Sequence, residues 1–175
     1  AARLEYNVFH DEHFFMNRQF TPFNTSPVEP NHISNLFDVA YDDGRLLAVT
    51  GEFKMKFTPE LDIVLRGAYY GWELDSLPKP WHKPDMELGL RAQYRFNQSL
   101  TLHGAVNLMG SRSVYLPEEN ATLDPVYDFN LGANYELNKR WHFFGEVRNM
   151  VASRYYRWYG YPMHGVNARV GVGYR

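Results

Sequence analysis

The stretch His10-Asp11-Glu12-His13 places two histidines and two carboxylates within four positions. Imidazole and carboxylate groups are common zinc ligands, so this stretch raises the question of a metal site. On a β-strand, side chains three positions apart point to opposite faces, so His10 and His13 converge only if the strand bends. We interpret the stretch as the polar end of a strand and predict no metal site.

Serine and histidine residues in the connecting segments could supply a Ser–His–acid site, but no spacing selects any of them. His103 and His142 are expected to point to the same side of two strands, and nothing completes a site with them. The sequence also lacks a glycine-rich phosphate-binding loop. We therefore predict that the chain is not an enzyme and carries no cofactor.

The composition limits the other classes of function. The 175 residues contain 18 Lys and Arg against 20 Asp and Glu, and a net charge of −2 argues against a nucleic-acid partner, which needs a basic surface. The absence of cysteine excludes disulfides and thiolate metal sites. No apolar run is long enough for a membrane-spanning helix, although 17% of the residues are aromatic.

An alternation of apolar and polar residues explains how a chain rich in aromatic residues can lack a long apolar run. From Val166 to Tyr174 every even position is apolar or aromatic, and every odd position is polar, charged or glycine. Such a period of two places all the apolar side chains on one face of a strand. The pattern predicts eight antiparallel strands, over 2–16, 35–57, 61–73, 86–96, 100–110, 126–137, 140–152 and 165–175.

Two properties favour a transmembrane barrel over a soluble sheet. The strands run about ten residues or longer, whereas soluble strands usually run about five or six. Their polar faces combine glycine with charges of both signs, as the interior of an outer-membrane barrel does. We expect hydrocarbon to cover Leu88, Leu90, Ala92, Phe129, Leu131, Ala133, Val170 and Val172. We expect the lumen to receive Gln93, Asn130 and Asn134 and the charged residues Arg66, Glu87, Arg91, Glu136, Glu146, Arg148 and Arg169.

The connections alternate between tight turns and long loops, which is typical of outer-membrane barrels. Tight turns are predicted at 58–60, 97–99 and 138–139, and long loops near 18–34, 74–85, 110–125 and 152–164. The sequence Asp42-Asp43-Gly44-Arg45 has the composition of a hairpin turn. A turn there would move the proline-rich 21–33 segment to the tight-turn side, so we predict one long, bulged second strand instead.

Several motifs resemble a known family. They are Trp81-His82-Lys83-Pro84-Asp85, Asp128-Phe129-Asn130-Leu131-Gly132, Phe143 to Asn149, Tyr155-Tyr156-Arg157-Trp158 and Gly171-Val172-Gly173-Tyr174-Arg175. Together they resemble the C-terminal barrel strands of TonB-dependent outer-membrane receptors, most closely the receptor-like proteins of Bacteroidetes-type bacteria. The resemblance implies that residues 1–175 are one barrel segment, without the plug domain, of a barrel of about 22 strands.

The family likeness implies a receptor of the bacterial outer membrane that takes up a scarce nutrient and is coupled to TonB through a plug. Candidate ligand-binding residues in the long loops are Trp81, His82, Lys83, Asp85, Tyr155, Tyr156, Arg157 and Trp158. The same residues could instead pack the loops over the barrel mouth. Two other functions stay open: a scaffold barrel that binds other outer-membrane proteins or lipoproteins, and a small complete barrel of eight strands.

Overall fold

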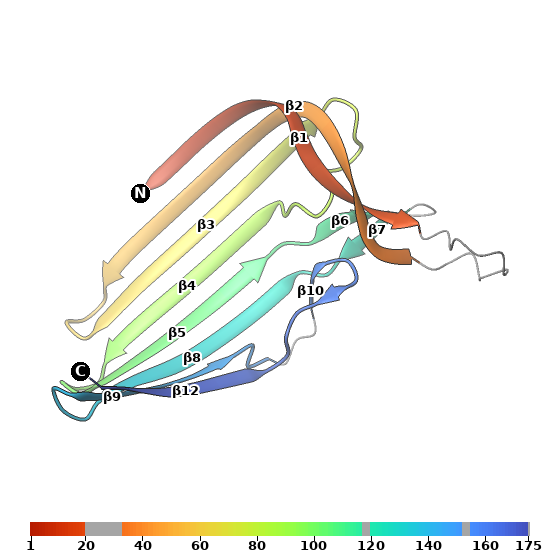
Figure 1. The fold of residues 1–175 in the computed structure, drawn as a ribbon. Helices are drawn as coiled ribbons and strands as arrows, with labels where there is room; N and C mark the ends of the chain where they lie inside the picture. The colour runs from red at the N-terminus through yellow and green to blue at the C-terminus, as the bar shows by residue number, and fades with distance from the viewer. Residues whose placement is uncertain (20–32, 117–119, 152–154, 175) are drawn as a thin grey trace, which may run out of the picture.

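Eight long strands form one antiparallel sheet in the computed structural model of the chain (Figure 1). The structure describes residues 1–19, 33–116, 120–151 and 155–174. Along the sheet the order is β1-β2-β3-β4-β5-β8-β9-β12, so each long strand pairs with the next long strand of the sequence. The strands are β1 (Ala2–Gln19), β2 (Ile33–Lys56), β3 (Leu61–Leu74), β4 (Met86–Arg95), β5 (Leu100–Met109), β8 (Val126–Glu136), β9 (Trp141–Arg148) and β12 (Asn167–Tyr174).

Two short hairpins lie within the long loops that the sequence predicted near 110–125 and 152–164. They are formed by β6 (Arg112–Tyr115) with β7 (Asn120–Leu123), and by β10 (Tyr156–Trp158) with β11 (Tyr161–Pro162). Residues 20–32, which include most of the predicted proline-rich loop, lie outside the described part of the chain. In the described ranges, no helix is long and apolar enough to cross a membrane.

The second strand is continuous, as predicted, and its pairing with β1 is irregular at two places. Phe9 pairs with Gly44 and Glu12 pairs with Asp42, so β1 uses one residue more than β2 over this step. Asp11 absorbs the extra residue with a φ of 53°, a conformation that Asp tolerates better than most residues. The Asp43 carboxylate stabilises the bulge, because Oδ1 accepts the Asp11 N–H at 2.9 Å. Farther along, Asn17 pairs with Phe37 and Gln19 with Ile33, so β2 carries two extra residues of its own there and is bulged, as predicted.

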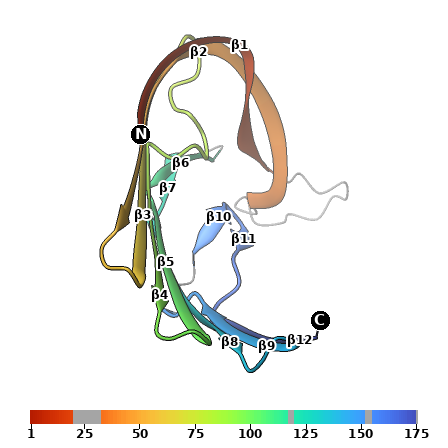
Figure 2. The ribbon, with the colours of Figure 1, turned by 90° about the vertical axis from the view of Figure 1, so that its left-hand side faces the viewer.

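The two faces of the sheet differ as the alternation predicts. Cross-strand neighbours share a face, and Leu131 lies between Gly104 and Val147 among apolar side chains and glycine. Nothing in the described chain covers this face: Leu131 is 52% exposed and Val170 85% exposed. Figure 2 shows that the sheet is curved like part of a barrel wall, with β10 and β11 on its concave side. The fold is therefore an all-β, antiparallel membrane-barrel segment with an apolar convex face.

The eight strands do not close into a ring. Strands β1 and β12 lie at opposite edges of the sheet, and the described residues form no ladder between them. A bilayer offers no hydrogen bonds to such open edges, so the barrel requires further strands. This arrangement argues against a complete barrel made of these eight strands alone.

Buried apolar side chains gather at one end of the sheet, among the loops. Val114, Leu116 and Leu123 form a small core, and Ala121 and Tyr159 pack against it. Phe14 of β1 and Trp81 of the 75–85 loop are also almost completely buried. The loops are therefore folded onto one another and onto the sheet.

Candidate functional site: the loop cap and the concave wall

The loops form one packed assembly over an end of the concave face. We call this assembly the loop cap; it consists of residues 75–85, 110–116 and 155–163 with the ends of β1 and β2 at 12–17 and 37–43. Phe14 and Val114 have no solvent exposure, and Trp81 has 1%. This burial shows that the cap has an interior of its own.

Asp42 ties the 75–85 loop to β2. Its carboxylate accepts the backbone N–H of Ser76 at 3.0 Å and that of Leu77 at 2.8 Å. The Asp75 N–H donates to the Asp43 carbonyl at 3.0 Å and extends the attachment. Asp42 and Asp43 have the composition of a turn but belong to a continuous strand. Asp42 attaches the 75–85 loop to this strand, and Asp43 stabilises the bulge at Asp11 of β1.

The structure places Trp81 and Lys83 in packing positions. The Trp81 ring meets Tyr115 edge to face, with 5.7 Å between ring centres. Lys83 Nζ lies 2.6 Å from Glu12 Oε1 and about 5 Å from the ring centres of Phe14 and Trp72. Cation–π contacts of this kind fix an ammonium group in place. Asp85 lies at the end of this loop, and its carbonyl accepts the Tyr70 N–H at 2.8 Å.

His82 joins the 75–85 loop to three other parts of the cap. Its φ of 60° turns the backbone so that the His82 N–H donates to the Ser113 carbonyl at 2.8 Å. Its ring Nδ1 lies 3.0 Å from the Phe15 carbonyl oxygen, and its Nε2 accepts the Tyr159 N–H at 3.4 Å. Burial lowers the pKa of His82, the Phe15 contact partly offsets that effect, and the nearby Arg112 charge lowers the pKa further.

His82 also belongs to an aromatic cluster with Phe15, Phe37, Trp158 and Tyr161. Its ring centre lies 5.2 Å from that of Trp158 and 5.4 Å from that of Phe37. Trp158 meets Phe15 at 5.2 Å, and Tyr161 stacks on Phe37 at 5.7 Å. Tyr161 is 46% exposed, so the cluster reaches the surface there. The sequence analysis identified His82 and Trp158 as site residues but missed Tyr161, three positions after Trp158, and Phe15 and Phe37, which lie far away in the sequence.

Arg112, which the sequence analysis also missed, holds the β10–β11 hairpin. Only 2% of this residue is exposed. Its guanidinium donates to the carbonyls of Arg157 at 2.9 Å, Tyr156 at 3.0 Å and Asp124 at 3.2 Å. Burial, together with the Arg157 charge, lowers the pKa of Arg112 from its usual high value. Arg112, Val114 and Leu116 stand two positions apart and are all buried on one face, whereas Ser113 and Tyr115 between them are less buried. This period of two is the pattern of a small strand.

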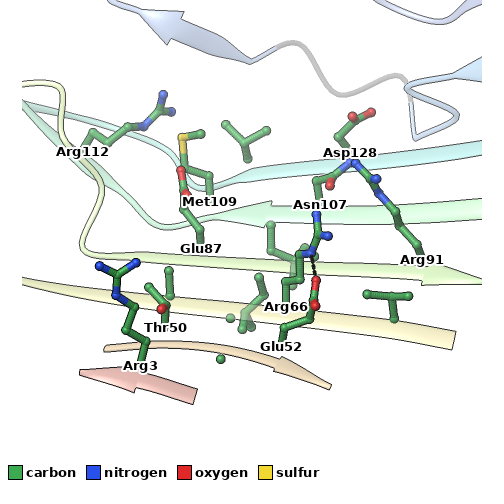
Figure 3. A pocket seen from close by; sticks show the side chains of 18 of the residues that line it. Arg3, Thr50, Glu52, Arg66, Glu87, Arg91, Asn107, Met109, Arg112 and Asp128 are labelled. Atoms are coloured by element: carbon green, nitrogen blue, oxygen red, sulfur yellow. Dashed lines mark hydrogen bonds and ion pairs between the residues drawn. The ribbon is translucent and has the colours of Figure 1, made fainter. Parts of the chain in front are cut away.

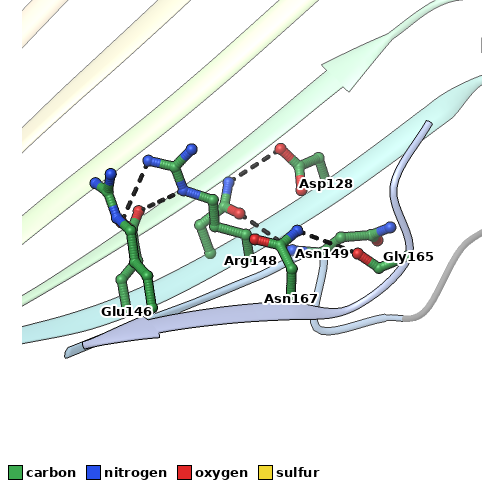
Figure 4. A network of polar contacts seen from close by, with 8 residues as sticks. Asp128, Glu146, Arg148, Asn149, Gly165 and Asn167 are labelled. Atoms are coloured by element: carbon green, nitrogen blue, oxygen red, sulfur yellow. Dashed lines mark hydrogen bonds and ion pairs between the residues drawn. The ribbon is translucent and has the colours of Figure 1, made fainter.

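The concave wall carries ion pairs along and between neighbouring strands. Glu146 Oε2 lies 2.6 Å from Arg169 Nε on β12, and Glu146 Oε1 lies 2.9 Å from Arg148 Nε (Figure 4). On the same wall, toward the β1 edge of the sheet, Arg66 of β3 lies 2.6 Å from Glu52 of β2. Opposite charges thus meet across strands on this face, in the arrangement expected of a lumen wall.

The remaining charges of this wall have different surroundings. Glu87 contacts the Tyr70 hydroxyl, and Glu136 pairs in register with His142 of β9. Arg91 lines two cavities that lie against the wall. Asp128 accepts a hydrogen bond from the Asn130 side chain at 3.0 Å, as Figure 4 shows.

The two cavities extend between the concave wall and the loop cap. One has a volume of about 650 Å³ and is lined by side chains of both signs, including Arg66, Arg91, Arg112 and Asp128 (Figure 3). The other, of about 960 Å³, reaches farther along the wall. Tyr155 lines both cavities, and burial with the nearby Asp128 raises the pKa of its hydroxyl, which therefore stays neutral at physiological pH.

The structure separates the residues of the His10–His13 stretch. His10 Nδ1 lies 3.2 Å from Asp43 Oδ2, whereas the His13 ring packs against Phe15. Across the described ranges, no three His, Asp or Glu residues are grouped as a metal site requires.

Sheet, cap and cavities together define a class of structure: part of the wall of a large antiparallel barrel whose mouth is covered by folded loops. Solved structures of other proteins share this architecture. The chain aligns over 99% of its length with FpvA of Pseudomonas aeruginosa bound to a pyoverdine–iron complex, with a TM-score of 0.69 and 17% sequence identity. It aligns equally far with FpvAI in complex with pyocin S2, with a TM-score of 0.67 and 17% identity.

The third structure is the closed form of the ferric-catecholate import receptor Fiu from Escherichia coli K12. Here the TM-score is 0.65 and the identity 13%, again over 99% of this chain. The chain covers 24% of each of the three proteins, about a quarter of their length. No protein-family model and no curated protein sequence matches the chain. The chain therefore has the fold of a segment of a TonB-dependent receptor barrel.

Proposed function

We propose that the chain is part of an outer-membrane receptor that takes up a scarce nutrient by TonB-dependent transport. The main support is one observation: a curved eight-stranded sheet has an uncovered apolar convex face and a charged concave wall, with folded loops at one end. Hydrocarbon is the solvent that favours such a convex face. The role is non-enzymatic.

The open edges of β1 and β12 lead us to place this segment in a larger ring. Barrels of about 22 strands hold a plug in the lumen, and a plug is the route by which we expect TonB to act. In this arrangement the segment is the C-terminal part of the barrel, as the motifs suggest. Its likeness to receptors of Bacteroidetes-type bacteria remains a prediction.

We propose a ferric chelate as the nutrient. The solved structures with this fold include one bound to a pyoverdine–iron complex and one named a ferric-catecholate import receptor. In this chain, Tyr155 and Arg157 line the 650 Å³ cavity beneath the cap, and the neighbouring Tyr156 is 45% exposed. We assign these three residues to ligand contact, and Trp81, His82, Lys83, Asp85 and Trp158 to holding the cap in shape.

Uptake of radiolabelled ferric chelates by iron-starved cells tests this function. We expect uptake to require both this protein and TonB, and Arg157→Ala to reduce it. Arg140→Ala, in the exposed turn at the other end of the sheet, is the matched control and should leave uptake unchanged. If deletion of the protein leaves uptake intact while the protein co-purifies with other outer-membrane proteins or lipoproteins, the scaffold function is correct instead.

A further inference from the structure

The His82 ring is the point at which four segments of the loop cap meet. It contacts the Phe15 carbonyl of β1, the Phe37 ring of β2, and Tyr159 and Trp158 of the β10–β11 hairpin. Its own backbone N–H donates to Ser113 of β6. Only 6% of His82 is exposed, so these contacts replace water around the ring.

The two ring nitrogens face partners of opposite kinds. Nδ1 faces a carbonyl oxygen, which can only accept, so Nδ1 must carry the proton. Nε2 faces the Tyr159 N–H, which can only donate, so Nε2 must present its lone pair. The hydrogen-bond network thus assigns the neutral Nδ1–H tautomer. A second proton would sit on Nε2, abolish the Tyr159 bond and set two donors against each other.

The charged groups on the surrounding elements do not offset that second proton. Glu12 on β1 is held by Lys83, and β6 contributes the cation Arg112. The same elements carry the exposed His13 on β1, Asp38 on β2, Arg157 on β10 and Asp85 on the loop itself. On β2, Asp42 accepts the N–H groups of Ser76 and Leu77, and Asp43 accepts that of Asp11. No carboxylate of the described residues makes a hydrogen bond or ion pair with the His82 ring.

We propose that neutral His82 positions the β10–β11 hairpin against the rest of the loop cap, and that protonation of His82 in mildly acidic surroundings releases the hairpin from the other cap segments. Because the pKa of His82 is lowered in the folded cap, docking is fully stable above the ordinary histidine value of about 6.5. Docking of the hairpin weakens as the pH falls below this ordinary value and through the lowered pKa of His82 in the folded cap. The hairpin carries Arg157 and leads to Tyr155, so its release widens the 650 Å³ cavity. The inference concerns the cap alone and does not depend on the identity of the ligand.

Amide hydrogen exchange of the membrane-embedded protein tests the proposal. After correction for the intrinsic pH dependence of exchange, we expect the 155–163 segment to lose protection roughly tenfold between about pH 7.5 and about pH 5. Strands β4 and β5 should show no such change and serve as internal references. Equal corrected protection of the 155–163 segment at both pH values would overturn the proposal.

Two variants separate His82 from other titrating groups. His82→Asn keeps an N–H donor for the Phe15 carbonyl, tolerates the positive φ and does not titrate, so the pH dependence should vanish. His13→Asn removes an exposed histidine of the same cap and should retain the full pH dependence. A pH dependence that persists in His82→Asn would assign the effect to another group and refute the proposal.

A measurement on the unmodified protein covers the case in which His82→Asn fails to fold. The slow exchange of the imidazole C2–H, followed by mass spectrometry, reports the titration of each histidine separately. We expect His82 to titrate over the same pH range in which the 155–163 segment loses amide protection. If the two transitions occur at clearly different pH values, His82 is not the residue that positions the hairpin.

Discussion

Gly44 on β2 lies so close to the carbonyl oxygen of Glu73 on β3 that a Cβ atom at position 44 would collide with it. The same Cβ would lie 2.9 Å from the Phe9 ring and 3.2 Å from the Cα of Leu74. Two of these obstacles are backbone atoms of the neighbouring strand, which cannot turn away as a side chain can. Glycine is therefore required here for close strand approach within a continuous strand.

Gly44→Ala should destabilise the protein by about 1–3 kcal/mol, because β2 and β3 must separate to admit the methyl group. Urea unfolding in lipid vesicles measures the change. Gly165→Ala is the matched control, since a Cβ at position 165 meets nothing within 4 Å. Equal stability of the two variants would show that the strands tolerate the extra volume.

The same glycine illustrates what the sequence could predict. Asp42-Asp43-Gly44-Arg45 has the composition of a turn, and only the alternation of tight and long connections argued for a continuous strand. The eight long strands and their two faces were predictable, because period-two alternation is local. The bulge at Asp11 was not, because it depends on the Asp43 carboxylate 32 residues away.

The cap was less predictable than the sheet for the same reason. His82 was identified by its motif, but its role depends on the Phe15 carbonyl, which lies 67 positions away. Arg112 carries no motif, and its partners are backbone carbonyls that any sequence supplies. Long-range contacts to backbone atoms leave no pattern in a single sequence.

The two faces of β8 should respond very differently to charge. Leu131 lies on the convex face, so Leu131→Arg should cost about 2–4 kcal/mol if the residue is near the middle of the bilayer. Asn130→Arg, one position away on the concave wall, should cost far less, since that face already carries charges. Unfolding titrations of both variants in vesicles provide the comparison. Equal costs would mean that both faces meet the same solvent.

The ion pair between Glu146 and Arg169 should contribute little to stability despite its 2.6 Å separation. The Arg169 side chain is 60% exposed, and pairs in such surroundings typically contribute about 0.2–1 kcal/mol. A double-mutant cycle with Glu146→Gln and Arg169→Met should give a coupling energy in this range, reduced at about 1 M salt by screening. A coupling of several kcal/mol would show that the concave wall is shielded from water.

Arg112 should stabilise the docked β10–β11 hairpin through hydrogen bonds that do not themselves depend on pH, in contrast to those of His82. Arg112→Met fills a similar space but leaves the carbonyls of Tyr156, Arg157 and Asp124 without their donor. Hydrogen bonds from a charged donor contribute about 1.5–3 kcal/mol each, so the 155–163 segment should lose most of its exchange protection. Arg112→Lys should rescue it only partly, because an ammonium group lacks the planar arrangement of donors that reaches several carbonyls at once.

Arg140→Met is the matched control for this variant, since Arg140 is exposed in a turn at the far end of the sheet. It should leave the exchange of the 155–163 segment unchanged. The comparison belongs at about pH 7.5, where His82 is neutral and the hairpin is docked; the guanidinium adds no pH dependence of its own, because it stays charged throughout this range. Normal protection in Arg112→Met would mean that the aromatic cluster and the Val114–Leu116–Leu123 core hold the hairpin without these hydrogen bonds.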